Sequence, residues 1–286
     1  MNRLPRWLLI ALAVGPTAGL AAFYVWPFVT LVVEAVDATV LADTFGRAAT
    51  WEVVWFTLWQ AVASTVVTIA VGLAPAYVLA RYDFRGRTVI VGLLTAMFVL
   101  PTVVMGAAFL ALLPDSLDRT VWAVIGAHVV FNLAVVVRVV GSLWEHLPTD
   151  MEAAAATLGA SRWKVAIQIS LPLVRPAVTA AATIVFLFTF TSYGVIRVLG
   201  APGTRTIEVE VWRRATQLGD IGGAAVLAVL QLVALIAIVT WSTVAQRRHA
   251  QAIGLLPTSG RRRPRTTGER RFVALVAGAA LVVAAA

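Results

Sequence analysis

The chain has 286 residues, of which 60% are hydrophobic and 13% are charged, and its mean hydropathy is +0.88. Soluble domains carry about 25% charged residues, so this composition excludes an ordinary soluble protein and predicts a membrane protein with helical spans. The lack of cysteine excludes disulfides and thiolate metal sites. The net charge of +9 suggests nucleic acid, but the positions of the arginines explain it better.

Six apolar segments are long enough to cross a bilayer as helices, which takes about 20 residues each. They are residues 7–33, 51–80, 88–113, 121–146, 173–199 and 224–246. A seventh segment, 272–286, reaches only about 22 Å as a helix, short of a membrane core of about 30 Å. The expected fold class is all-α: a polytopic membrane protein with six transmembrane helices and the start of a seventh.

The arginines predict the orientation. With the N-terminus in the cytoplasm, most of the 23 basic residues fall in cytoplasmic stretches, as Arg85, Arg162 and Arg261 do. The first segment resembles a signal peptide, with small residues at 19–21 that would suit cleavage. Because removing it would invert every later segment, we expect an uncleaved helix in a cytoplasmic (inner) membrane.

A polar insert at 147–172 separates the fourth segment from the fifth. Thr149 and Glu152 fit a capping box, Gly159 suits the left-handed end of a helix, and Ser161 suits the cap of a second helix. One apolar face follows from the spacing of Met151, Ala154, Ala155 and Leu158. This pattern predicts either a helix that docks into a partner's groove or a hairpin that lies on the membrane surface.

The insert resembles the EAA loop of the membrane subunit of binding-protein-dependent ABC importers. The family pattern is Glu-Ala-Ala, three residues, Gly, nine residues, Ile, one residue, Leu-Pro. The matching residues are Ala154, Ala155, Gly159, Ile169, Leu171 and Pro172. The chain departs at the Glu position, which is Ala153, and Glu152 stands one residue early. This departure puts in doubt any salt bridge from the family's Glu to the ATPase.

The resemblance implies a type I importer permease, whose loop docks into a separate ATP-binding subunit. The implied partners are a cytoplasmic ATPase, an extracytoplasmic solute-binding protein, a second permease half or a homodimer partner, and membrane lipid. The chain has no GxxxxGK[ST] phosphate-binding motif, so ATP hydrolysis is expected elsewhere and the chain is not expected to be an enzyme. We expect no cofactor and no metal site.

Residues 60–87, 127–138 and 206–212 look closest to the thiamine and ferric-iron branch, whose permeases often fuse two six-helix halves. The expected domains are 1–50 (first helix and external loop), 51–246 (permease domain), 247–271 (basic cytoplasmic linker) and 272–286 (start of another helix). The last segment predicts either a missing second half or a terminal surface or re-entrant helix. The linker is alternatively a patch for anionic lipid.

Polar residues inside the spans are candidates for a translocation pathway, because burying them in a bilayer is costly. The candidates are Gln60, Ser64, His128, Asn132, Ser192 and Tyr193. The alternative is that they form interhelical hydrogen bonds that hold the bundle together.

The external stretch 206–220 is a candidate contact for the binding protein, through Glu208, Glu210, Arg213 and Arg214. The alternative there is a solvated loop. Two rival functions are an ion-coupled secondary transporter and a membrane enzyme. The first needs acidic residues in mid-span, and the second needs a nucleophile–base or metal cluster; the sequence shows neither.

Overall fold

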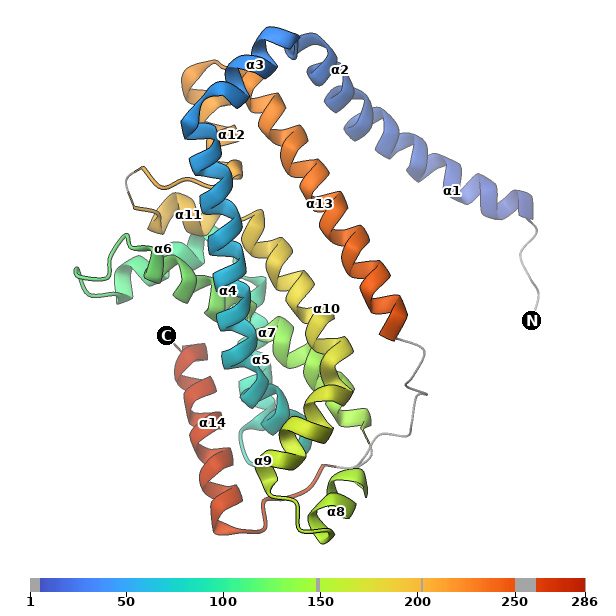
Figure 1. The fold of residues 1–286 in the computed structure, drawn as a ribbon, viewed down its shortest axis with the longest axis vertical. Coiled ribbons are helices and arrows are strands. Elements are labelled where there is room, and N and C mark those ends of the chain that lie inside the picture. The colour runs from blue at the N-terminus through green and yellow to red at the C-terminus, as the bar shows by residue number, and fades with distance from the viewer. Residues whose placement is uncertain (1–5, 148–149, 202, 250–260, 286) are drawn as a thin grey trace. The chain divides into compact units, whose positions relative to one another are not determined.

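The computed structural model describes residues 6–147, 150–201, 203–249 and 261–285, and its regular structure there is helical (Figure 1). An isolated bridge pairs Tyr82 with Arg262. The expected all-α fold is confirmed. The helices are α1 (Arg6–Leu20), α2 (Trp26–Ala35), α3 (Ala38–Gly46), α4 (Ala48–Arg81), α5 (Arg87–Val99), α6 (Thr102–Leu112), α7 (Val121–His146), α8 (Asp150–Thr157), α9 (Arg162–Val165), α10 (Leu171–Phe190), α11 (Gly194–Leu199), α12 (Ile207–Arg213), α13 (Ile221–His249) and α14 (Thr267–Ala285), with π-helical turns η1 (Ala21–Val25), η2 (Ala166–Ser170) and η3 (Arg214–Leu218).

Five helical stretches in the described part of the chain are long and apolar enough to cross a membrane. They are Ala11–Ala35, Ala48–Arg81, Val121–His146, Ala166–Phe190 and Ile221–Gln246. A sixth span results only if α5 and α6, which are bent by 110° from each other, count as one. The helix α14, which carries Glu269, Arg270 and Arg271 near its start, is not among these stretches.

The apolar segment over 88–113 is not one continuous helix, because α5 ends at Val99 and α6 begins at Thr102. Pro101 explains the break. A residue before proline is pushed out of the helical region, and Leu100 has φ −62° and ψ 141°. Proline also lacks the N–H that would continue the helical hydrogen bonds.

The segment 173–199 is also broken, since α10 ends at Phe190 and α11 begins at Gly194. The sequence has no proline at this break. Instead, α11 packs closely on α6: a Cβ atom added to Gly194 would lie 2.7 Å from the backbone nitrogen of Val103. The packing around Gly106 of α6 is also close, because a Cβ atom added there would lie 3.0 Å from the Cβ of Val198. Small residues at a helix interface allow such close packing in membranes.

The chain forms two compact units, of which one comprises residues 53–209 and 233–286. Its centre is α7, where apolar side chains such as Val124, Val136 and Val140 are almost fully buried. Different stretches of α7 pack against α4 and α10, against α5 and α14, and against α11. The contact with α4 is tight, because an added Cβ at Gly72 would lie 2.7 Å from a Val136 methyl carbon.

The other unit comprises residues 1–52 and 210–232. The continuous helical run from α1 through η1 to α2 has no buried residue in its most apolar window, Ala11–Ala35. The Asp37 carboxylate caps α3 by accepting hydrogen bonds from the backbone N–H groups of Thr39 and Val40, at 2.9 and 2.8 Å. The hydrogen bond that its carboxylate accepts from the Thr39 side chain, together with these, lowers the pKa of Asp37.

Candidate functional site

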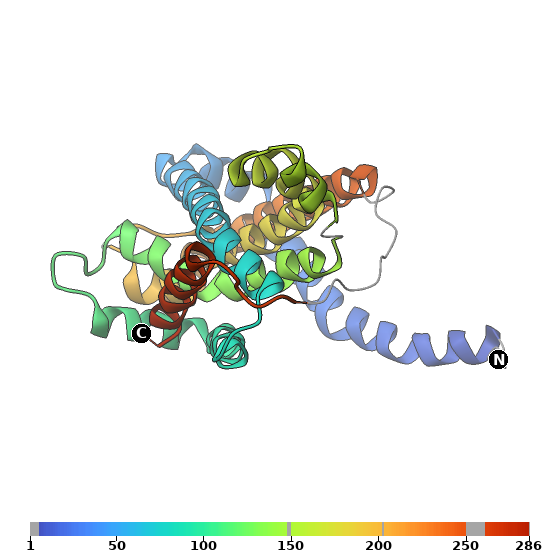
Figure 2. The ribbon, with the colours of Figure 1, turned by 90° about the horizontal axis from the view of Figure 1, so that it is seen from below.

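The EAA loop, residues 147–172, lies at one end of the unit centred on α7, with the end of α4 and the start of α14 (Figures 1 and 2). The predicted glycine stop is confirmed: Gly159 has φ +82°, and the backbone N–H of Ala160 donates to the carbonyl of Ala155 at 3.0 Å. The Ser161 hydroxyl accepts from the Lys164 backbone N–H at 3.4 Å, which confirms the second cap. The loop therefore folds as two short helices joined at Gly159.

The predicted capping box cannot be followed, because Thr149 lies outside the described residues, but the surroundings of Glu152 are described. Its carboxylate oxygen lies 3.2 Å from Nη2 of Arg81 and accepts a hydrogen bond from the Ser170 hydroxyl at 2.9 Å. Arg81 also donates through Nη1 to the carbonyl of Leu147 at 2.9 Å. Arg81 is buried, and a buried charge requires a partner, which Glu152 supplies.

The contacts of Glu152 with Arg81 and Ser170 join α8 to the last residue of α4 and to η2. The sequence analysis did not identify Arg81 as part of this site. The sequence feature that could have identified Arg81 is a basic residue at the end of a long apolar helix. The helix dipole and the membrane orientation explain such a residue equally well. The helical path of the chain continues through Pro172. The π-helical turn η2 leads directly into α10, with Pro172 in its first turn, where the missing N–H is tolerated.

The predicted apolar face of α8 is exposed. Leu158 has 88% of its surface accessible and Met151 has 49%, and Ala154 is also exposed, while Ala155 is partly buried. At the other end of the loop, Ile169 is partly buried, and Leu171 and Pro172 are exposed. The polar Glu152 therefore faces the protein, whereas Met151 and Ala154 of the same short helix, and Leu158 directly after it, are exposed.

A second cluster of predicted residues lies in the interior of the same unit. The ring of His128 on α7 joins two serines: Nδ1 lies 3.2 Å from Oγ of Ser64 on α4, and Nε2 lies 2.8 Å from Oγ of Ser192 in the break after α10. The Ser192 carbonyl accepts a hydrogen bond from Thr206 at 3.0 Å. These contacts satisfy the polar groups that the break in the fifth span exposes.

Gln60 and Asn132 extend this buried network. The Gln60 amide nitrogen donates to the carbonyls of Thr57 and Thr189 at 3.1 and 2.9 Å, and that of Asn132 donates to the carbonyl of His128 at 2.9 Å. The side-chain oxygens Oε1 of Gln60 and Oδ1 of Asn132 are buried and accept no hydrogen bond from the described residues. The side chains of Ser64, His128 and Ser192 are thus joined directly. Asn132 bonds to the backbone of His128, Gln60 bonds to other carbonyls, and Tyr193 is partly buried next to Ser192 in the chain.

The candidate contacts for a binding protein lie in or next to α12 rather than in an irregular loop. Glu210 and Arg214 are buried and pair with each other at 3.1 Å, and Arg213 pairs with Glu210 at 2.7 Å. Arg214 also donates to the Thr50 hydroxyl at 3.2 Å. The hydrogen bonds to Glu210 raise the pKa of Arg213. Of the four candidates, Glu208 and Arg213 are the partly exposed ones.

Two solved ABC transporters have a chain with a similar arrangement of helices. A bacterial ABC transporter that imports the acidic polysaccharide alginate has a chain that matches with a TM-score of 0.71 at 16% identity, covering 85% of this chain and 96% of that chain. The MetNI methionine ABC transporter matches with a TM-score of 0.51 at 17% identity, covering 71% and 98%. The fold is therefore that of an ABC importer permease.

The chain belongs to the family of binding-protein-dependent transport system inner membrane components, whose pattern matches residues 69–251. The resemblance drawn from the EAA loop is confirmed. The thiamine transport system permease protein ThiP of Salmonella typhimurium is 28% identical, over 91% of this chain and 51% of that protein. A probable molybdenum ABC transporter permease of Haloferax volcanii is 31% identical, over 68% and 74%. The chain spans about half the length of the first of these relatives.

Proposed function

We propose that this chain is the membrane permease of an ATP-driven importer and that the exposed face of α8 docks into a separate ATPase subunit. The observation that carries the proposal is the division of α8 into two faces. Glu152 is tied inward to Arg81 and Ser170, whereas Met151, Ala154 and Leu158 are exposed. An apolar helix face of this kind fits a hydrophobic groove.

The proposed cargo is a small solute such as thiamine or ferric iron. The similarity to ThiP supports thiamine, while relatives named for molybdenum, sulfate and putrescine transport show how far the cargo varies among similar permeases. A solute-binding protein would contact the external stretch 206–220 through Glu208 and Arg213. An alginate importer solved with its periplasmic binding protein has the same fold, which supports this arrangement. A second permease half, or a second copy, would complete the pathway.

An ion-coupled secondary transporter is the less favoured function. Carrying protons or sodium across a membrane requires ionisable groups at mid-depth. The described helices that qualify as spans carry their acidic residues near their ends, as Glu52 and Glu145 illustrate. The buried polar groups at mid-span are instead neutral amides, hydroxyls and an imidazole.

Docking is tested by placing charge on the apolar face. The variants Ala154→Glu and Leu158→Glu should prevent co-purification of the ATPase, because a carboxylate would be buried in the groove without a partner. The matched control is Thr157→Glu, which adds the same charge at an exposed position that is not part of the predicted apolar face. Membrane insertion should be normal in all three. If the ATPase binds both face variants as well as it binds the control, the docking assignment is wrong.

The proposed orientation, with the N-terminus and the EAA loop in the cytoplasm, has its own test. The chain has no native cysteine, so single cysteines report cleanly. Cysteines at Ser116 and Thr204 should react with a membrane-impermeant thiol reagent applied to intact cells. One at Ser259 should react only after permeabilisation. Labelling of a cysteine at Ser259 in intact cells would show that the proposed orientation is wrong.

A further inference from the structure

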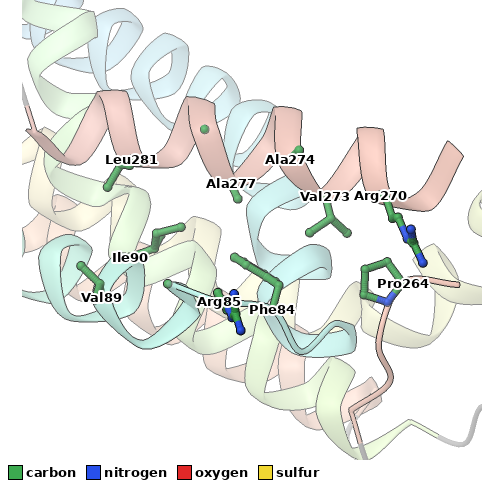
Figure 3. A pocket seen from close by; sticks show the side chains of 12 residues that line it. Phe84, Arg85, Val89, Ile90, Pro264, Arg270, Val273, Ala274, Ala277 and Leu281 are labelled. Carbon is green, nitrogen blue, oxygen red and sulfur yellow. The ribbon is translucent and has the colours of Figure 1, made fainter. Parts of the chain in front are cut away.

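A groove of about 470 Å³ runs between α5 and α14, in the unit centred on α7 (Figure 3). Its volume is within the roughly 300–1,000 Å³ of ordinary ligand sites. The side chains that line it are mainly apolar and come from both helices. They include Phe84, Val89, Ile90, Val273, Ala277 and Leu281.

The polar side chains of the groove are two arginines. Arg85 stands two residues before α5 and Arg270 in the first turn of α14, so each precedes the apolar lining residues of its own helix, and Arg85 lies between Val89 and Arg270 in Figure 3. Leu281 and Val89 lie at the other end. The groove thus has a basic end and an apolar end, as an amphiphilic ligand requires.

These two arginines differ from their neighbours in their ion pairs. Arg87 and Arg261 both pair with Glu145, at 3.3 and 2.7 Å, and Arg262 pairs with Glu269 at 3.2 Å. Arg85 and Arg270 are exposed, and within the described ranges neither forms an ion pair. Glu145 and Glu269 are therefore already paired, and among the described residues neither arginine pairs with the nearby Asp83, so two guanidinium groups at the groove remain available to an external anion.

We propose that this groove binds one anionic phospholipid, with an acyl chain along the apolar lining and the headgroup phosphate at Arg85 and Arg270. Basic pockets between transmembrane helices at the membrane interface bind acidic headgroups, and guanidinium groups match phosphate oxygens geometrically. The charge at one end favours a lipid over an apolar protein segment. The inference requires that the chain is embedded in a membrane, and it does not depend on transport.

The test is native mass spectrometry of the full chain in detergent titrated with phosphatidylglycerol. In the double variant Arg85→Gln/Arg270→Gln, affinity for the first bound lipid should fall about thirtyfold, given the contribution of an arginine near an anionic lipid surface. The matched control, Arg263→Gln/Arg265→Gln, removes two exposed charges from the same segment outside the groove lining. It should bind the first lipid as the unmodified chain does.

A second pair of variants leaves the charges in place. A Cβ added at Gly278, which lines the groove, meets nothing within 4 Å, so Gly278→Leu should fold and fill the space of the acyl chain. Gly92→Leu adds the same side chain at another open position on α5, outside the lining. Loss of the bound lipid only in Gly278→Leu supports the site. The proposal is wrong if the two double arginine variants lose equal affinity for phosphatidylglycerol, or if Gly278→Leu binds the lipid normally. It is also wrong if the unmodified chain binds phosphatidylcholine as tightly as phosphatidylglycerol.

Discussion

The EAA loop and the buried network around His128 both contact α4, but their polar groups have different roles. Ser64, in the middle of α4, bonds to His128, and both side chains lie inside the protein. Arg81, at the end of α4, bonds to Glu152, whose helix presents Leu158 to the outside. Polar contacts that close on themselves stabilise a bundle. Polar contacts beside an exposed apolar face position a surface for a partner.

The largest effect on stability is expected where the interior leaves least room. Gly194→Ala places a methyl group 2.7 Å from the backbone nitrogen of Val103 and 2.9 Å from the carbonyl carbon of Thr102. Backbone atoms cannot move aside as a side chain does, so we expect a loss of about 3 kcal/mol, at the upper end for overpacking. Thermal unfolding in detergent measures it.

Gly92→Ala is the control for this substitution, since an added Cβ there meets nothing within 4 Å. Alanine is the better helix former by about 1 kcal/mol, so this variant should be as stable as the unmodified chain or more so. Equal unfolding temperatures for the two variants would show that α6 and α11 are not packed as closely as described.

A smaller effect is expected from opening the buried network. His128→Ala leaves the hydroxyls of Ser64 and Ser192 without their shared partner, which should cost about 1–3 kcal/mol. His146→Ala is the control, because the His146 ring bonds to the carbonyl of Ser142 within the same helix. If the network instead serves only to line a pathway, His128→Ala will change transport and leave the unfolding temperature as it is in the control.

The smallest effect is expected at the tie that holds the EAA loop. A double-mutant cycle of Arg81→Ala and Glu152→Ala should give a coupling energy of about 1 kcal/mol, because the pair is only partly withdrawn from water. The exposed pair of Arg47 and Asp43 should give less than about 0.5 kcal/mol in the same experiment. A coupling energy at Arg81 no larger than at Arg47 would mean that the loop is positioned by other contacts.

Different kinds of sequence signal succeeded to different degrees. The stop at Gly159 and the cap at Ser161 were predicted because they depend on one residue and its immediate neighbours. The contact of Glu152 with Arg81 was not predicted, because it joins residues 71 positions apart and the sequence shows only the local cap with Thr149, which lies outside the described residues. His128 and Ser64 were flagged as polar residues in apolar segments, but their pairing spans 64 positions.

The sequence by itself determined that this is an all-α membrane protein of an importer family, since hydrophobic length and a spaced loop motif are local properties of the chain. Only the tertiary structure decided that the span over 173–199 breaks after Phe190. That break has no proline; it is stabilised by hydrogen bonds to His128 and Thr206 and by the close approach of α6 to Gly194. A helix interrupted within a membrane persists only where distant groups satisfy its backbone, and those groups are assembled by folding.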